Sequence, residues 1–395
     1  MAPSFDDHTT SSSRATTATT TTATKYRKIT PPPNQPLLPG LPDHISLLCL
    51  SLLPPSTLYS VCRSWRRVIF FDNFPASLSL YTLSSDQDST LQISSFDPIS
   101  SQWTTVPPPP TTHLRRVCLR HPSFISRTLP IQSLSVAGQL ILLAGTTSDL
   151  LPALPRPLVF DPRSKIWSFG PPLPTPRRWC AAGSSRAAVI VASGLATRHS
   201  PAVARSVEKW VFRETDSLDE KREDSKWVWK KMRSLRDGKL SREAIDAVGC
   251  RGKLYMVNVK GACAKEGVVY DVDSDGWSEM AEAMVGGWRG PAAAMDEEVI
   301  YVVDELQGVL RKYDDVMEVW VDVLENGMLK GAEHIAAGGG RVCVVGGGGD
   351  GILVVDVVSS PPRLWVVETL AGHRVLGLHI LPRMCPPEFQ SPVVV

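Results

Sequence analysis

The sequence predicts a mostly β protein: a six-bladed β-propeller that follows a small α-helical module and a disordered N-terminal tail. Three observations lead to this prediction. A motif of an aromatic residue, an aspartate and a tryptophan recurs along most of the chain. Two short amphipathic helical patterns precede the first copy of the motif. Threonine, serine and proline dominate the residues before those helices.

Composition narrows the function classes. The 395 residues exceed a typical single domain, and the formal net charge of +2 lacks the basic excess of proteins dedicated to nucleic acids or membrane surfaces. The 8 cysteines show no metal-ligand spacing, and no secretory apolar segment precedes them. We therefore expect reduced thiols in the cytoplasm or nucleus, no nucleic-acid partner and no membrane partner.

Residues 1–36 form the predicted tail. They contain the threonine-rich run Thr16–Thr24, the basic run Lys25–Lys28 and the prolines Pro31–Pro33. Too little apolar surface is available there to offset the entropy of ordering the backbone, so we expect disorder. A plastid transit peptide is the alternative, since such peptides are rich in Ser and Thr and poor in acidic residues. Asp6 and Asp7 favour the tail.

Residues 37–76 form the predicted helical module. In the first helix, an apolar face has the i, i+3, i+4, i+7 spacing typical of amphipathic helices. Pro42 and Asp43 suit the start of this helix, and Pro54-Pro55 ends it. Ser56 is placed to cap a second helix with its own apolar face. The two faces consist of Ile45, Leu48, Cys49 and Leu52 in the first helix, and of Leu58, Val61, Cys62, Trp65, Val68 and Ile69 in the second.

Residues 77–390 carry the repeats. Each copy reads as a strand, a tight turn of Asp, Ser, Pro or Gly residues, and a strand that bears Trp. The copies are Phe96–Trp103, Phe160–Trp167, Val207–Phe212 joined to Trp227 or Trp229, Tyr270–Trp277, Tyr313–Trp320 and Val355–Trp365. A very apolar strand precedes most copies, and a strand of small residues precedes that one. Four strands per repeated unit is typical of propeller blades.

Six Trp-bearing copies predict six blades, with the Trp side chains as wedges between them, each burying on the order of 150–250 Å². The first copy lacks an inner strand, whereas a strand without a partner, Arg374–Leu381, follows the last copy. Its addition to the first blade closes the ring and removes both exposed edges. The charged insertion Arg213–Lys231 reads as a solvated loop, with a partner-docking loop as the alternative.

The module resembles the F-box of plant F-box/kelch-repeat proteins. The resemblance rests on Leu41-Pro42-Asp43, on the Leu53-Pro54 break and on Val61-Cys62-Arg63-Ser64-Trp65-Arg66. The Asp-containing turns and Trp residues resemble kelch repeats, although the kelch double glycine is intact only at Gly346-Gly347. An ordinary helical hairpin packed on a neighbouring domain is the alternative for the module.

The resemblance implies docking onto a Skp-type adaptor and, through it, onto a cullin–RING ubiquitin ligase. The chain would then be the substrate-recognition subunit, with an unknown target protein on the propeller and with no catalysis of its own. The adaptor-binding residues implied are Leu41, Pro42, Ile45, Leu48, Leu53, Pro54, Leu58, Val61 and Trp65. A kelch scaffold that recruits no ligase and a propeller enzyme are the alternatives.

No sequence motif predicts an enzyme or a cofactor. The glycine runs Gly338–Gly340 and Gly346–Gly349 lack the Gly-Lys-Ser/Thr of a phosphate loop, so we expect tight turns. The 8 histidines are isolated and lack metal-ligand spacing. We expect no cofactor.

One basic residue precedes each inner strand of the predicted propeller. These residues are Arg127, Arg178, Arg242, Arg289, Lys330 and Arg374. Because the loops between blades open on one face, the six side chains are placed to ring the mouth of the central channel and to bind substrate there. The alternative is that they pair with acidic residues nearby, such as Asp304, Glu305 or Asp350.

Overall fold

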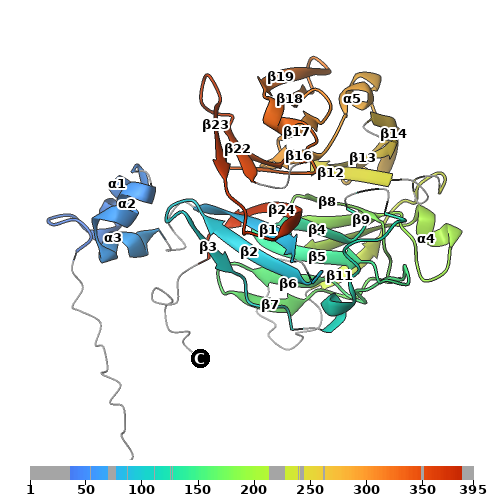
Figure 1. Cartoon of the computed structure of the whole chain (residues 1–395), viewed down its shortest axis with the longest axis horizontal. Helices are drawn as coiled ribbons and strands as arrows, with labels where there is room; N and C mark the ends of the chain where they lie inside the picture. Colours follow the sequence, from blue (N-terminus) through green and yellow to red (C-terminus); the bar gives the residue numbers. More distant parts are fainter. Residues whose placement is uncertain are drawn as a thin grey trace, which may run out of the picture.

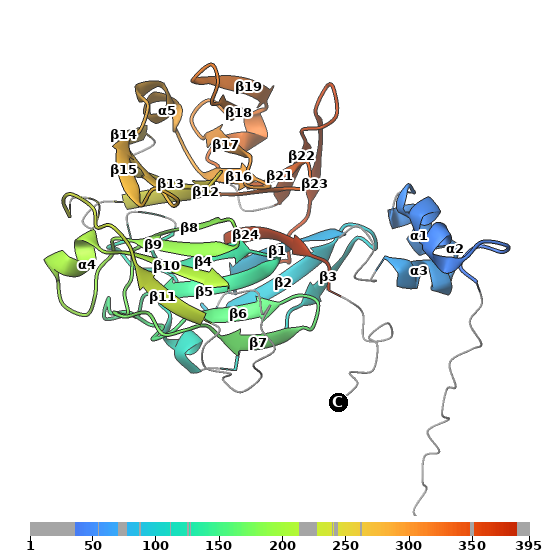
Figure 2. The same cartoon turned by 180° about the vertical axis from the view of Figure 1, so that it is seen from behind.

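The structure is a computed structural model, and it describes residues 36–384 except 54, 70–76, 87, 111, 125, 127, 213–226, 239, 241–243, 261–262 and 348–350. The predicted disordered tail therefore lies outside the described residues, apart from Pro36. In the described residues, a module of short helices stands beside a β-propeller (Figures 1 and 2).

The helical module contains α1 (Asp43–Ser51), α2 (Pro55–Val61) and α3 (Arg63–Val68). The prediction of a single second helix is wrong, because the helix is interrupted at Cys62. The Cys62 carbonyl accepts the Arg66 N–H, and this bond begins α3. This break lets α3 turn back onto α2, so that Leu58 and Val68 enter one small core.

The propeller has six four-stranded antiparallel sheets within the described residues, which confirms the predicted fold class. From the inner strand outwards, the first three blades are β24 (Arg374–Pro382), β1 (Leu78–Ser85), β2 (Leu91–Asp97) and β3 (Gln102–Thr105); β4 (Ile131–Val136), β5 (Gln139–Gly145), β6 (Leu158–Asp161) and β7 (Ile166–Phe169); and β8 (Ala181–Ser185), β9 (Ala188–Ala192), β10 (Val207–Phe212) and β11 (Trp227–Lys231).

The other three blades are β12 (Ala244–Cys250), β13 (Lys253–Lys260), β14 (Cys263–Asp271) and β15 (Gly276–Glu279); β16 (Ala292–Met295), β17 (Val299–Asp304), β18 (Val309–Asp314) and β19 (Val319–Glu325); and β20 (His334–Gly338), β21 (Arg341–Val345), β22 (Ile352–Asp356) and β23 (Arg363–Val367). The connections also hold η1 (Thr112–Arg116), α4 (Pro201–Arg205), α5 (Glu282–Gly287) and η4 (Gly327–Leu329).

The ring closes as predicted, through the C-terminal strand. β24 pairs with β1 over its length, with Ile380 opposite Leu80. The hydroxyl of Tyr81 donates to the carbonyl of Pro382 at 2.9 Å, and each inner strand contacts the inner strand of the next blade around the ring. Blade 1 is thus built from both ends of the propeller, and it has four strands like the other described blades.

The repeated motif has one geometry in five of the six blades. The Trp of the outer strand lies directly opposite an aromatic residue of the preceding strand, and the two rings are 5.0–5.5 Å apart. An Asp follows that aromatic residue in blades 1, 2, 4 and 5, whereas Val211 follows Trp210 in blade 3. The pairs are Phe96–Trp103, Phe160–Trp167, Trp210–Trp229, Tyr270–Trp277 and Tyr313–Trp320. The Asp side chain accepts backbone N–H groups of its own turn, as Asp271 does from Asp273 and Ser274.

Blade 6 departs from this geometry, and the predicted wedge role is wrong for Trp365. Val355 lies opposite Leu364, so Trp365 sits one position further along β23, opposite Val354. A shift of one residue moves a strand side chain to the other face of the sheet. Trp365 consequently lies on the same face of the sheet as Val354, the face opposite to that of Val355 and Leu364, and it is 43% exposed.

The insertion in blade 3 is shorter than the sequence predicts. Its last residues, Trp227–Lys231, form β11, and Trp229 pairs with Trp210. Residues 213–226 lie outside the described residues, so the predicted solvated loop or docking loop is not placed.

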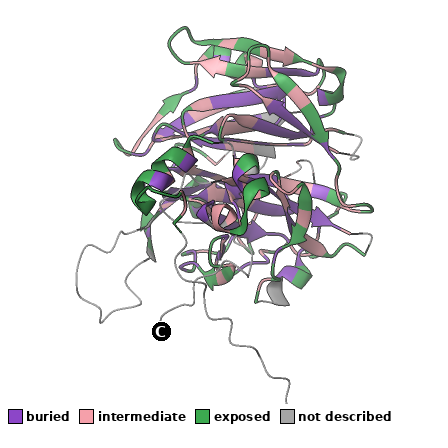
Figure 3. Ribbon diagram, turned by 90° about the vertical axis from the view of Figure 1, so that its left-hand side faces the viewer, coloured by how far each residue is buried: buried purple, intermediate pink, exposed green. Residues whose placement is uncertain are grey.

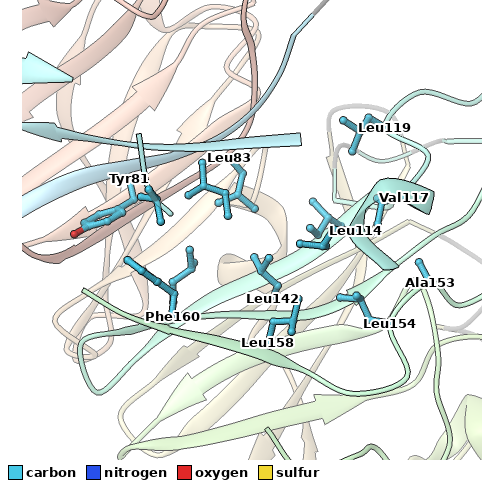
Figure 4. Close-up of a cluster of buried hydrophobic side chains, with 14 of the residues drawn as sticks. Tyr81, Leu83, Leu114, Val117, Leu119, Leu142, Ala153, Leu154, Leu158 and Phe160 are labelled. Carbon is cyan, nitrogen blue, oxygen red and sulfur yellow. The ribbon is translucent and has the colours of Figure 1, made fainter. Parts of the chain in front are cut away.

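Buried side chains follow the strands and continue from blade to blade. Figure 4 shows the seam between blades 1 and 2, where Tyr81 and Leu83 of β1 face Leu142 of β5 and Phe160 of β6. Seen from the side of the helical module, exposed residues cover much of its helices and of the turns (Figure 3). The core therefore lies between blades, and the helical module contributes little to it.

Candidate functional site

The helical module presents apolar side chains to solvent. We define its docking face as Leu41, Ile45, Leu48, Leu52, Leu53 and Val61. Leu48 is 65% exposed, Leu52 85% and Val61 53%, whereas Leu50, on the other side of α1, is 1% exposed. The predicted apolar stripe of α1 thus points away from the module's own core. Several large apolar side chains that stay exposed on so small a module indicate an interaction site.

Three of the remaining predicted adaptor residues differ in their exposure to solvent or lie outside the described residues. Pro42 is exposed beside the docking face. Trp65 is half-buried, and its indole N–H donates to the carbonyl of Leu37 at 2.9 Å. Pro54 lies outside the described residues.

Leu58 requires a correction. It is completely buried against Leu50, Val68 and Ile69, because the break at Cys62 folds α3 over it. It supports the docking face from inside and is not available to a partner. Leu52, by contrast, belongs to the docking face, and its place in the i+7 position of the predicted stripe was the signal for it.

The six predicted basic residues precede the inner strands, and we call the side of the ring on which those strands begin the mouth face. Arg178, Arg289, Lys330 and Arg374 come before or at the start of β8, β16, β20 and β24. Arg127 and Arg242 lie outside the described residues.

The four described residues have different environments. Arg374 forms an ion pair with Glu333 at 3.2 Å, and the Nε of Arg289 donates to the carbonyl of Gly286 at 3.2 Å. Lys330 is exposed. The guanidinium of Arg178 stacks on the ring of Trp179, 4.1 Å from its centroid, and burial lowers the pKa of Arg178.

Two cavities meet at the mouth face. The central channel, of about 490 Å³, is lined by small residues of all six inner strands. A second hollow, of about 730 Å³, includes Arg120, His121, Glu333 and Arg374, and it shares His334 with the channel. Both signs of charge line this hollow, so it suits a polar segment of a partner. Sequence reasoning missed Arg120 and His121, which lie in the long connection between β3 and β4.

His379 is built into the channel wall. Its two ring nitrogens are hydrogen-bonded to Ser133 at 2.8 Å and Ser135 at 3.1 Å, across the seam between β24 and β4. Burial lowers the pKa of His379 to about 4. The ring is therefore neutral at physiological pH and joins blades 1 and 2.

Two features of the described residues bear on other function classes. They contain no group of three or more His, Cys, Asp or Glu residues arranged to hold a metal ion. None of their helices has both the length and the apolar character needed to span a membrane.

Comparison with known proteins places the chain in a family, although no protein-family model matches it. It is 48% identical to the F-box/kelch-repeat protein SKIP25 of Arabidopsis thaliana over 376 residues, which cover 92% of this chain and 94% of that protein. It is 25% identical to the F-box protein AFR of the same plant over 69% of each chain. With the F-box/kelch-repeat protein SKIP4, also from Arabidopsis, it shares 23% identity over 83% of this chain and 90% of that protein.

The first of these similarities spans the helical module and the propeller together, and its extent and identity are sufficient to assign the family. The chain belongs to the F-box/kelch-repeat proteins.

Proposed function

We propose that this chain is the substrate-recognition subunit of a Skp–cullin–F-box ubiquitin ligase. The helical module, as the F-box, binds the Skp-type adaptor, and the propeller holds a target protein. The chain performs no bond chemistry in this role. It raises the effective concentration of the target near the ubiquitin-loaded enzyme.

The exposed docking face is the observation that carries this proposal. A module of this size buries little apolar surface by itself, yet Leu48, Leu52 and Val61 are more than half exposed. An adaptor that covers them removes apolar area from water, at roughly 25 cal/mol per Å². Membership of the F-box/kelch-repeat family supports a Skp-type adaptor as that partner.

For the substrate, we propose the mouth face. Arg178, Arg289, Lys330 and Arg374 come before or at the start of four inner strands, on the mouth face. Guanidinium groups bind carboxylate and phosphate oxygens through paired N–H donors. The mixed charge of the hollow beside Arg374 and Glu333 favours a polar peptide segment that carries acidic groups.

The proposal is tested by adaptor binding to the full chain and to three variants. Leu48→Glu and Val61→Glu each put a charge on the docking face, and Ser60→Glu puts the same charge on an adjacent exposed position of α2. Burial of one Leu or Val side chain stabilises a complex by about 1.5–3 kcal/mol. We expect each docking-face variant to weaken adaptor binding by about tenfold or more, and Ser60→Glu to bind as the wild type does.

Equal adaptor binding by all four chains would exclude the docking face as the adaptor site. A wild-type chain that binds no Skp-type adaptor while it captures target proteins would instead establish the scaffold that recruits no ligase.

A further inference from the structure

Among the described residues, an arginine that follows the last strand of the propeller contacts the helical module. Arg383 follows β24 directly and forms an ion pair with Asp97 of β2. Its guanidinium also lies over the ring of Tyr59 of α2, 5.3 Å from the centroid. The Arg383 side chain is 6% exposed and that of Asp97 15%, so water screens this ion pair little.

Residues of the helical module add further contacts around Tyr59. Arg66 of α3 covers the Tyr59 ring at 4.7 Å, so the ring has two guanidinium groups over it. Ile99, in the turn that follows Asp97, packs against the small core of the module. Cation–π contacts of this kind strengthen when they are shielded from water, and an apolar contact beside them supplies that shielding.

The backbone of Arg383 is fixed by the closure of the ring. The Arg383 N–H donates to the carbonyl of Ser77 at 2.8 Å, and the carbonyl of the preceding Pro382 accepts the Tyr81 hydroxyl at 2.9 Å. Both bonds depend on β24 lying against β1. Arg383 therefore reaches Tyr59 only when the C-terminal strand has completed blade 1.

The contact partner in blade 1 is the aspartate of the repeated turn. In blades 1, 2, 4, 5 and 6 this Asp accepts backbone N–H groups of its own turn. In blade 6 it also pairs with an arginine: Arg341 binds Asp356 at 2.9 Å and lies 5.9 Å from the Trp365 ring. The Arg341 group contains an Arg, a turn Asp and an aromatic ring, but no residue of the helical module. Blade 6 thus holds a counterpart of the Arg383 group that cannot hold the module.

We propose that Arg383, Asp97 and Tyr59 form a latch that fixes the orientation of the helical module relative to the propeller and that forms only in a closed ring. Arg383 acts as a positioning residue. One consequence rests on the proposed ligase function. The latch sets the orientation of the bound adaptor relative to the propeller, and hence the distance between the bound target and the ubiquitin-loaded enzyme.

The latch is tested on the full chain by pulsed electron paramagnetic resonance, which measures the distance distribution between two spin labels. One label is placed on Cys49, which is exposed on α1, and the other on a cysteine introduced by Val316→Cys in blade 5, where Val316 is 85% exposed. Serine replaces the other cysteines that are not shown to be buried, which are Cys62, Cys118, Cys263 and Cys385.

Three variants of the labelled chain distinguish the effect of losing the latch from a general loss of stability. Arg383→Gln removes the charge from the propeller side, and Tyr59→Leu removes the ring from the module side while it keeps an apolar side chain. Arg341→Gln is the matched control in blade 6. We expect one narrow distribution for the labelled parent and for Arg341→Gln, and a broad one for Arg383→Gln and for Tyr59→Leu.

Adaptor binding and thermal unfolding of the propeller are measured on the same variants, and we expect both to be unchanged by Tyr59→Leu. A broad distribution in the parent, or a narrow one in either latch variant, overturns the proposal. Because the distances are measured without adaptor, a chain that fails to bind a Skp-type adaptor still gives a clear result for the latch.

Discussion

The indole N–H of Trp103 in blade 1 donates a hydrogen bond of 2.9 Å to the backbone carbonyl of Glu368, 265 residues later in the chain. Glu368 follows β23, the outer strand of blade 6, so this bond joins the first blade to the last. The same bond is made from the motif Trp of blades 2 to 5 to the segment that leaves the preceding blade. The other pairs are Trp167–Pro107, Trp229–Pro171, Trp277–Arg233 and Trp320–Met284.

This bond predicts a specific loss of stability in Trp103→Phe. The substitution keeps an aromatic ring against Phe96 but leaves the Glu368 carbonyl without its donor. A hydrogen bond of this kind contributes about 0.5–1.5 kcal/mol net, and we expect urea unfolding to show a decrease of that size. Trp365→Phe is the control, since Trp365 is partly exposed and its indole forms no such bond in the described residues. Equal losses of unfolding free energy in the two variants would contradict a stabilising role of the Trp103–Glu368 hydrogen bond.

Removal of the C-terminal strand tests the closure of the ring. A chain that ends at Gly372 lacks β24, so it leaves β1 without its inner neighbour and exposes its backbone groups as an edge. We expect aggregation or loss of a single cooperative unfolding transition, as measured by calorimetry and light scattering. A truncated chain that melts as the full chain does would rule out closure through β24.

A buried ion pair in blade 3 predicts a large effect of Arg177→Met. Arg177 is fully buried, and its guanidinium binds Glu208 at 2.6 Å and the Ser206 hydroxyl at 2.7 Å. Without the arginine, the Glu208 carboxylate is left buried without its counter-charge, which costs about 3–5 kcal/mol in comparable cases. The double variant Arg177→Met with Glu208→Leu should recover much of that loss in chemical denaturation. No recovery would mean that packing, rather than charge, sets the cost.

The neutral His379 predicts a pH dependence of stability. Its pKa is lowered from an ordinary 6.5 to about 4 in the folded chain, so between these values the unfolded chain binds a proton that the folded chain excludes. Stability must therefore fall as the pH falls from about 6.5 towards 4, by about 1.4 kcal/mol per unit of pKa difference at most. His379→Gln cannot titrate there. We expect its unfolding free energy to change less between pH 7 and pH 5 than that of the wild type, and parallel pH profiles would contradict the assignment.

The proposed substrate face predicts a salt-sensitive interaction. Arg178→Ala with Arg289→Ala should weaken capture of the target by about 1–3 kcal/mol for each lost charged hydrogen bond, and added salt should weaken the wild-type interaction. Pull-down of target proteins at two ionic strengths measures both effects, and adaptor binding serves as the internal control. A target that binds the double variant normally and ignores salt would place the binding face elsewhere.

Much of the fold could be predicted from the sequence because the information is local and repeated. Five of the six copies of the motif hold their own turn Asp, every copy holds a Trp, and alternation along the strands shows which side chains face a neighbouring blade. The closing strand was predictable for the same reason, since an incomplete first copy and an extra last strand must match. Trp365 shows the limit: a shift of one position between β22 and β23 leaves the motif recognisable but reverses the side chain.

The sequence by itself determined the blades, their number, the apolar stripe of α1 and the family to which the chain is similar. Only the tertiary structure decided which apolar residues of the helical module remain outside, because the turn at Cys62 buries Leu58 and leaves Val61 exposed. It also decided which arginines have partners and where the module rests. Arg383 and Tyr59 are far apart along the chain and share no pattern, and the closure of the ring alone brings them together.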